Sequence, residues 1–588
     1  MAESIISPGV FTRENDQSFL QQQPIQAGAA IIGPTVKGPV ETPTLVTSYS
    51  DYKNKFGATF TSGSNSYSYF TSIAAYNYFQ NGGDTLLVTR VTREAFTPAR
   101  TAKSAADTST SAISSSAELS AAFQPAFVLE TISKGANQNS YSTEDSAGAL
   151  ESGSAENVRW EISQRNVNSG TFTLLIRKGN DKSNDKAILE TYANVSLDPY
   201  ADNYIARVIG DQRETVLTDS SGAKFLQVTG SYSNKSRYVY VAEVKNTTPN
   251  YFDNTGNFKP AYTASLPIVS SGSFGQATGT LFGAGAAYYN DITVDSNIQG
   301  IPASRYADAI KLLSNRDAYL FNSLIIPGLT AEMTGDAASR ITEVLSLANE
   351  RGDFLAVFDM VNYGKVNTST VTGEAATFDS SYSATYWPWC QVEDPDLGRL
   401  VWVPASVLMP GVFAFNDNSA EPWFAPAGLN RGALTRVIRT ERILSKADRD
   451  ALYSGNVNPI ATFPNTGVVV FGQKTLQKRA SALDRVNVRR LLIQLKSYIG
   501  QLAQNLVFEQ NTIATRNSFL SQVNPYLETV QQRQGLYAFR VVMDDSNNTP
   551  DVVDRNQLVG QIFLQPTKTA EFIVLDFNVL PTGAEFPS

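Results

Sequence analysis

Residues 323–358 read SLIIPGLTAEMTGDAASRITEVLSLANERGDFLAVF. The apolar run at 323–326 predicts a buried strand that ends at Pro327-Gly328, and the run at 354–358 predicts a second strand. Between these runs, apolar side chains recur at the spacing of one helical face: Ile341, Val344, Leu345 and Ala348. A strand, a helix and a strand in this order predict a sheet with parallel strand pairs and covering helices.

The same order of elements occurs nearer the N-terminus. The run AGAAIIG at 27–33 predicts a strand that stops at Gly33-Pro34, and LLVTRV at 86–91 predicts another strand. A helix is expected between them, with one apolar face made of Tyr69, Ile73, Tyr76 and Phe79. These elements belong with the later ones in an α/β fold.

The clearest helix lies in the last hundred residues. Its apolar stripe repeats every three or four residues: Val488, Leu492, Leu495, Ile499, Leu502 and Leu506. Further on, residues 571–580 read EFIVLDFNVL, an apolar strand that Pro581 closes. Such a strand at a chain end needs a sheet to join, either its own or that of a neighbour.

Between the strand–helix–strand unit at 27–91 and the one at 323–358, the composition changes. From about residue 96 the chain becomes rich in serine, and from 158 to 294 it shows short alternating strands separated by turn residues. We interpret residues 96–296 as a mostly β insertion, exposed and carried on loops of the first domain. The alternative interpretation is a separate β domain with a function of its own.

The length of 588 residues exceeds what one hydrophobic core supports, so several domains are expected. The fold class is predicted to be mixed α/β and multidomain, with β-sheets flanked by helices. The expected division is an N-terminal arm at 1–20, a middle α/β domain at 21–95 and 297–459, the β-rich insertion at 96–296, and a C-terminal domain at 460–588 that ends in the strand 571–581.

Composition argues against several classes of function. The net charge of −8 disfavours nucleic-acid binding, because phosphate neutralisation needs a basic face. The chain has no histidine, which removes every histidine-based catalytic or zinc arrangement, and its single cysteine, Cys390, cannot form an intrachain disulfide. We predict no signal peptide, no membrane insertion and no cofactor.

Three motifs have a chemical interpretation that the surrounding residues do not support. Residues 33–39, GPTVKGP, have proline directly after the last glycine, where a phosphate-binding loop continues with lysine and then serine or threonine. Residues 354–359 have the apolar strand and aspartate of a magnesium-binding motif, but no phosphate loop accompanies them. Residues 393–396, EDPD, are interpreted as a turn between strands rather than as an acid-base pair.

One run of basic residues is a stronger candidate for a functional surface. Between Lys474 and Lys496, seven basic residues face a single acid, Asp484. A solvated helix face and a docking surface for an acidic protein partner both fit this run, and nucleic acid fits it less well.

Motifs in a fixed order resemble the contractile tail sheath family. In the first part these are Ser7-Pro8-Gly9-Val10, Ala29-Ala30-Ile31-Ile32-Gly33-Pro34, Lys37-Gly38-Pro39, Phe79-Gln80-Asn81-Gly82-Gly83 and Val88-Thr89-Arg90-Val91. In the second part they are Tyr386-Trp387-Pro388-Trp389, Asp394-Pro395, Val401-Trp402-Val403-Pro404, Trp423-Phe424-Ala425-Pro426-Ala427-Gly428, Asn458-Pro459-Ile460, Phe463-Pro464, Gly467-Val468-Val469-Val470-Phe471-Gly472, Val486-Asn487-Val488-Arg489-Arg490-Leu491-Leu492 and Phe508-Glu509-Gln510-Asn511. The resemblance covers about residues 5–95 and 300–586, and leaves 96–296 unmatched.

The resemblance implies a structural, non-enzymatic subunit of a helical sheath of many copies, built as stacked hexameric rings around an inner tail tube. It implies that the partners are the tube protein, the baseplate proteins and the tail terminator protein, and that the chain makes no direct contact with nucleic acid. A phage virion assembled in the bacterial cytoplasm is the expected location. The alternatives are the sheath of a bacterial contractile injection system and, from another class, a carboxylate-based hydrolase using Glu144, Asp145 and Glu151.

Family sheaths link neighbouring copies by exchanging strands, and the C-terminal domain lies nearest the tube. The resemblance therefore assigns strand exchange between subunits to Val10, Phe11, Thr12, Phe572, Ile573, Val574, Leu575, Phe577 and Val579. The basic run is the expected tube contact: Lys474, Lys478, Arg479, Arg485, Arg489, Arg490 and Lys496.

Overall fold

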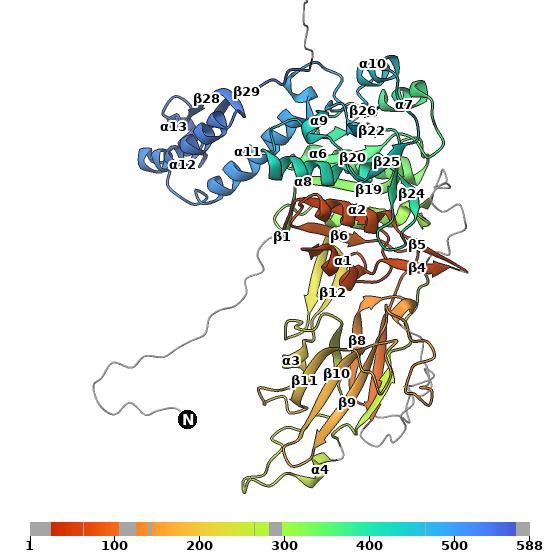
Figure 1. Ribbon diagram of the computed structural model, residues 1–588. Helices are drawn as coiled ribbons and strands as arrows, with labels where there is room; N and C mark the ends of the chain where they lie inside the picture. Colours follow the sequence, from red (N-terminus) through yellow and green to blue (C-terminus); the bar gives the residue numbers. More distant parts are fainter. Residues whose placement is uncertain are drawn as a thin grey trace, which may run out of the picture.

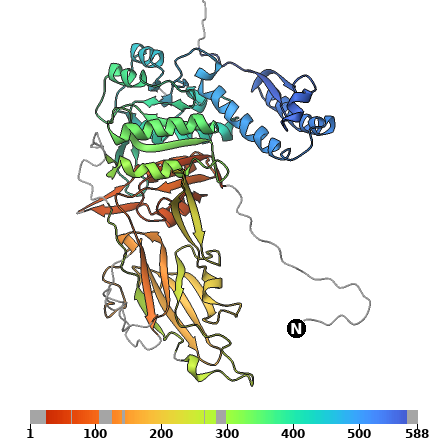
Figure 2. The same ribbon diagram turned by 180° about the vertical axis from the view of Figure 1, so that it is seen from behind.

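The computed structural model describes residues 25–62, 64–104, 125–138, 144–263, 265–281, 297–464 and 466–571. Four hydrophobic clusters occur among these residues. Two lie mainly in what we call the central body (within 25–95 and 297–485), one gathers side chains between Ala99 and Phe274 in the segment predicted to be an insertion, and one belongs to a C-terminal unit built mainly from residues 486–571. The insertion lies below the central body in Figure 1, and the C-terminal unit projects to one side in both views (Figures 1 and 2). The mixture of helices and strands in several parts confirms the predicted fold class.

A six-stranded sheet forms the centre of the body, in the order β21-β20-β19-β2-β6-β3. Its strands are β2 (Ala29–Gly33), β3 (Thr44–Val46), β6 (Leu86–Arg90), β19 (Ser323–Thr330), β20 (Leu355–Asp359) and β21 (Ser383–Ala384). All neighbours pair in parallel except β3 and β6, as the alternation of strands and helices predicted. The helices around it include α1 (Tyr49–Phe56), α2 (Phe70–Gln80), α5 (Ala307–Leu312), α6 (Asp336–Arg351), α7 (Thr368–Ala375) and α8 (Met409–Ser419).

The predicted end of β19 is wrong. We expected the strand to stop at Pro327-Gly328, but it continues to Thr330, which pairs with Asp359. The register shifts between Ile325 and Thr330, so the proline and glycine lie in an irregularity of the ladder rather than at its end. Proline fits there because an irregular position needs no N–H in the ladder.

Smaller elements complete the body. Two three-stranded sheets consist of β22 (Tyr386–Trp387), β26 (Asn458–Phe463) and β27 (Gly467–Val470), and of β23 (Cys390–Glu393), β24 (Leu400–Val403) and β25 (Val437–Thr440). Two-stranded pieces are β1 (Ile25–Ala27) with β18 (Tyr319–Phe321), β4 (Thr59–Ser62) with β5 (Asn65–Ser68), and β16 (Asn297–Ile298) with β17 (Ile301–Pro302). The helices α9 (Gly428–Arg431) and α10 (Lys446–Ser454) lie beside them, and a capping box of Ser445 and Asp448 begins α10.

The insertion contains two sheets that face one another. One consists of β14 (Val239–Val244), β8 (Pro125–Lys134) and β7 (Pro98–Ser104), and the other of β11 (Ile188–Ser196), β10 (Thr171–Lys178), β9 (Val158–Asn166) and β15 (Ser270–Ser273). Phe127 of β8 stacks on Phe172 of β10 with ring centroids 5.6 Å apart, so side chains of both sheets share one core. The short helices α3 (Ile205–Ile209) and α4 (Pro260–Thr263) belong to the same part.

A hairpin braces the insertion against the central body. It consists of β12 (Arg213–Thr218) and β13 (Lys224–Thr229), and β12 lies between the two parts in Figure 1. Val216 and Leu226 pack against the core of the body, and Lys224 forms an ion pair of 3.2 Å with Asp308 on α5. The predicted domain boundaries stay a prediction.

The C-terminal unit is built from two long helices and a hairpin: α11 (Val486–Gln504), α12 (Ile513–Gln532), β28 (Leu536–Val542), α13 (Pro550–Asp554) and β29 (Gln561–Pro566). The helix α11 confirms the long apolar stripe, which packs against α12 in a small core of its own. Trp423 connects this core to the central body, because its indole N–H donates to the carbonyl of Arg533 at 3.0 Å. No helix within the described ranges has both the length and the apolar character that a membrane span requires.

Candidate functional site

The hairpin of β28 and β29 is the sheet of the C-terminal unit in the described part of the chain, and it is covered on one face. Its two strands pair antiparallel from Leu536 with Pro566 to Val542 with Gln561, and no third strand joins them within the described part of the chain. One face packs on α12 through side chains such as Leu564. On the strands, Tyr537 and Phe563 are 62% and 56% exposed. An uncovered two-stranded sheet is weakly stable by itself and its edges can pair with another chain.

The chain leaves this hairpin and returns to the start of α11, where Glu571 is held by three side chains. Arg485 binds both carboxylate oxygens, with Nε to Oε1 at 2.7 Å and Nη2 to Oε2 at 3.0 Å. The Tyr453 hydroxyl donates to Oε2 at 2.7 Å, and Gln473 Nε2 donates to Oε1 at 3.1 Å. Tyr453 belongs to α10, so this cluster joins the end of the C-terminal unit to the central body.

Electrostatics favour the ionised form of Glu571. Burial by itself would raise the pKa of this carboxyl, but the hydrogen bonds from Tyr453 and Arg485 lower it below its ordinary value. For Arg485, burial by itself lowers the pKa of the guanidinium, but the hydrogen bond to Glu571 together with the charges of Tyr453, Glu571 and Asp484 outweighs it and raises that pKa. Both groups therefore stay charged, which makes their contact a bidentate, charge-assisted one. No pattern in the sequence indicates this cluster.

The residues predicted to exchange strands are not placed by the structure. Val10, Phe11 and Thr12, together with Phe572, Ile573, Val574, Leu575, Phe577 and Val579, lie outside the described residues. Their role in strand exchange stays a prediction. Glu571, the last described residue, directly precedes the C-terminal set.

The basic run does not form one exposed face. Arg489 is buried over the ring of Tyr382, 3.9 Å from its centroid, and its guanidinium also bonds Ser381. Arg490 is buried in a bidentate pair with Asp417, at 2.6 and 2.8 Å. Together with the contact between Arg485 and Glu571, these contacts give three of the seven basic side chains a partner within the chain.

The remaining members of the basic run differ in exposure. Lys474 is half-buried with its ammonium 4.5 Å from the centroid of the Tyr453 ring, and burial lowers its pKa. Lys478, Arg479 and Lys496 are exposed, and Lys496 donates to the Tyr382 hydroxyl at 2.9 Å. The tube contact stays a prediction, and these three exposed side chains are the members of the run able to reach a partner.

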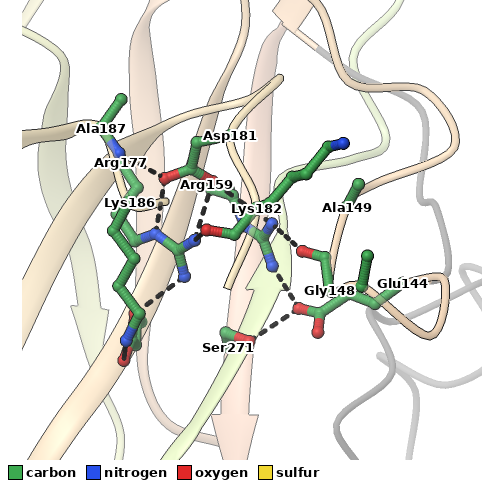
Figure 3. A network of polar contacts seen from close by, with 12 residues as sticks. Glu144, Gly148, Ala149, Arg159, Arg177, Asp181, Lys182, Lys186, Ala187 and Ser271 are labelled. Atoms are coloured by element: carbon green, nitrogen blue, oxygen red, sulfur yellow. Dashed lines mark hydrogen bonds and ion pairs between the residues drawn. The ribbon is translucent and has the colours of Figure 1, made fainter. Parts of the chain in front are cut away.

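The acids proposed for a hydrolase have structural roles. Glu144 belongs to a buried network in the insertion, where it accepts from Arg159 and, at 2.6 Å, from Ser271 (Figure 3). Asp145 closes a turn by accepting from the N–H groups of Ala147 and Ala149. Glu151 is exposed, so the structural roles concern Glu144 and Asp145.

The same network continues to the next two strands (Figure 3). Arg177, 1% exposed, binds both oxygens of Asp181 at 2.8 Å and Glu161 at 2.8 Å. Lys186 adds an ion pair of 2.7 Å to Glu161. Three cations and three carboxylates thus balance one another inside the insertion and fix its loops.

Two other acidic motifs also serve the fold. Asp394 accepts from the N–H groups of Asp396 and Leu397 at 3.0 and 3.2 Å, which is a turn, as predicted. Asp359 ends β20 and accepts from the N–H and hydroxyl of Ser406 at 3.0 and 2.5 Å. Burial raises the pKa of Asp359 to about 7. Among the described residues, no group of three or more acidic or thiol side chains could hold a metal ion.

Comparison with known proteins identifies the two parts around this cluster. Residues 303–476 match the family model of the phage tail sheath protein central domain, and residues 479–579 match that of the phage tail sheath C-terminal domain. The chain belongs to the contractile tail sheath family. Both models lie outside the insertion, and the Glu571 cluster joins residues from the two matched domains.

Named relatives agree with this assignment. The tail sheath protein of Vibrio phage KVP40 is 40% identical over 221 residues, which cover 38% of this chain and 32% of the relative. The tail sheath protein of Enterobacteria phage T4 is 33% identical over 287 residues, 45% of this chain and 42% of the relative. Each match therefore spans less than half of the curated sheath protein.

A solved sheath structure is similar over nearly the whole chain. It is the helical sheath of the anti-feeding prophage in its contracted state, with 15% identity, a TM-score of 0.46, and coverage of 98% of this chain and 99% of that one.

Proposed function

We propose that the chain is the structural subunit of a contractile phage tail sheath. Many copies polymerise helically around an inner tail tube, and the sheath then shortens and drives the tube through the host envelope for genome ejection. The matched central and C-terminal sheath domains support this function. Its partners are further copies of itself, the tube protein, and the baseplate and terminator proteins.

Neighbouring copies are linked through the β28–β29 hairpin, which accepts terminal segments of other subunits as added strands. The observation that carries this proposal is the uncovered hairpin, whose strands pair only with each other in the described part of the chain. An added strand satisfies backbone groups at the sheet edge and covers apolar side chains such as Phe563. Because the donated segment is part of the neighbour, the filament stays connected while the subunits move.

Contraction then needs no fuel molecule. Many subunit interfaces repack from a metastable to a more stable arrangement, and the exchanged strands act as flexible connections during that change. The assignment to a phage, rather than to a bacterial injection system, is favoured by the curated relatives, which are phage proteins.

The test is self-assembly of the purified chain. The full chain should form hollow, striated cylinders in negative-stain electron microscopy, whereas variants lacking residues 1–20 or 572–588 should stay monomeric while keeping the circular dichroism of the full chain. Cylinders formed equally well by both truncated variants would refute strand exchange, and absence of polymers from the full chain with its tube protein present would refute the sheath function.

A further inference from the structure

Residues 567–571 form a strap that leads from β29 back to the start of α11. At its first end, the N–H of Thr567 donates to the carbonyl of Gly535 at 3.2 Å, and the Thr567 hydroxyl donates to the carbonyl of Gln534 at 2.7 Å. At its other end stands Glu571 with its three partners. Between the ends, Lys568 and Ala570 are exposed, and the strap borders an open cleft of about 490 Å³. The strap is thus fixed at its two ends.

The Glu571 end is the stronger attachment. Its carboxylate makes four charge-assisted or hydroxyl hydrogen bonds, two of them to the planar guanidinium of Arg485. Gln473 adds a bond of 2.6 Å to the hydroxyl of Thr569, two residues earlier. The partners come from α10, from the segment after β27 and from the residue before α11, so three separate pieces of the fold hold one side chain.

We infer that Glu571 anchors the C-terminal segment to the central body, so that a pull on residues 572–588 is carried by α10 and α11 and not by the β28–β29 hairpin. This inference rests on the proposed strand exchange. Without the anchor, the pull would reach Pro566 and open the ladder from its last pair, Leu536 with Pro566. With the anchor, the hairpin can accept strands from other copies, and a pull on the C-terminal segment of its own chain does not reach it.

The experiment uses charge reversal and its rescue in the full chain. The variants are Glu571→Arg, Arg485→Glu and the double exchange, with Glu571→Gln as the milder change and Glu528→Arg, an exposed carboxylate of α12, as the matched control. Two quantities are measured: the rate of cleavage after Lys568 in the monomer by a protease specific for lysine, followed by mass spectrometry, and the urea concentration that dissociates preformed polymers.

We expect each single reversal to speed cleavage after Lys568 about tenfold, because opening of a bidentate ion pair exposes the strap. The same variants should form polymers that dissociate at lower urea, the double exchange should restore both quantities, and Glu528→Arg should change neither. Should a reversal prevent folding, Glu571→Gln gives the same two readouts with a smaller effect.

Three results would count against different claims. If removal of residues 572–588 abolishes polymers but the reversals leave cleavage and urea resistance unchanged, the anchor is refuted and strand exchange stands. If the truncated chain polymerises like the full chain, strand exchange itself fails, and with it the basis of the anchor. If the double exchange does not restore either quantity, the Arg485–Glu571 pair is not the attachment.

Discussion

The sheets of the insertion and the sheet of the C-terminal unit differ in how much of their surface the chain itself covers. In the insertion, two sheets face one another over a shared core, and a buried ion network joins β9 and β10 to the neighbouring loop. In the C-terminal unit, a two-stranded hairpin rests on one helix and leaves side chains such as Phe563 exposed. The difference teaches that the two facing sheets of the insertion cover one another within one chain, whereas the hairpin of the C-terminal unit has one face uncovered, which is where the proposed strand exchange would add contacts.

The largest effect is expected from breaking the ion network. Arg177→Met removes the guanidinium that Asp181 and Glu161 share and leaves Asp181 with the longer contact to Arg159 and Glu161 with Lys186, which costs about 3–5 kcal/mol of the stability of the insertion. Urea unfolding followed by hydrogen exchange in β9 and β10 measures the loss. Lys186→Met is the control, because this half-exposed lysine should contribute less than about 1 kcal/mol. A loss below 1 kcal/mol in Arg177→Met would contradict the account.

A matched pair of core substitutions sharpens the comparison. Leu174 in the insertion and Leu527 in the C-terminal unit are both fully buried, so each change to alanine should cost about 2–5 kcal/mol. Only Leu527→Ala should also lower the yield of polymers, because it loosens the helix beneath the acceptor hairpin. Equal losses of polymer from both variants, counted by electron microscopy, would remove the distinction between the two regions.

The central body should respond to pH through Asp359. Its pKa of about 7 in the folded chain lies above the ordinary value of 3.8, so the unfolded chain loses this proton first as the pH rises. Stability should therefore fall between about pH 4 and pH 7 and level off above. Asp359→Asn should flatten this dependence in urea titrations at pH 5 and pH 8, and the chain has no histidine that would titrate in the same range. An unchanged slope would assign the dependence to another group.

The smallest effect on folding is expected at the exposed basic residues. Reversal of Lys478 and Arg479 to glutamate should change the free energy of unfolding by less than about 0.5 kcal/mol. If these residues contact the tube, co-sedimentation with tubes should nevertheless fall. Reversal of Arg490 is not an equivalent test, because that side chain is paired with Asp417 inside the fold.

The spacing of apolar residues predicted the helices and strands correctly where one face of the element is apolar. The parallel strands β19 and β20, with α6 between them, follow directly from residues 323–358. The helix α12 was missed, although Phe519, Val523 and Leu527 repeat every four residues, because Pro525 interrupts the pattern. Proline is tolerated there since its position in the helix is exposed.

The site was less predictable than the fold. Arg489 and Arg490 suggested a basic surface, but burial and pairing depend on distant residues such as Asp417. Glu571 and Arg485 are 86 positions apart, and no local pattern indicates that they meet. Charges that are neighbours in sequence can point into different environments, and only tertiary packing decides which of them reach solvent.

Amide hydrogen exchange of monomer and polymer tests the central claim most directly. If the hairpin accepts strands from other copies, amides of β28 and β29 should become protected on polymerisation, while those of β9 and β10 in the insertion should exchange at the same rate in both states. Unchanged exchange in the hairpin of a well-formed polymer would contradict the account.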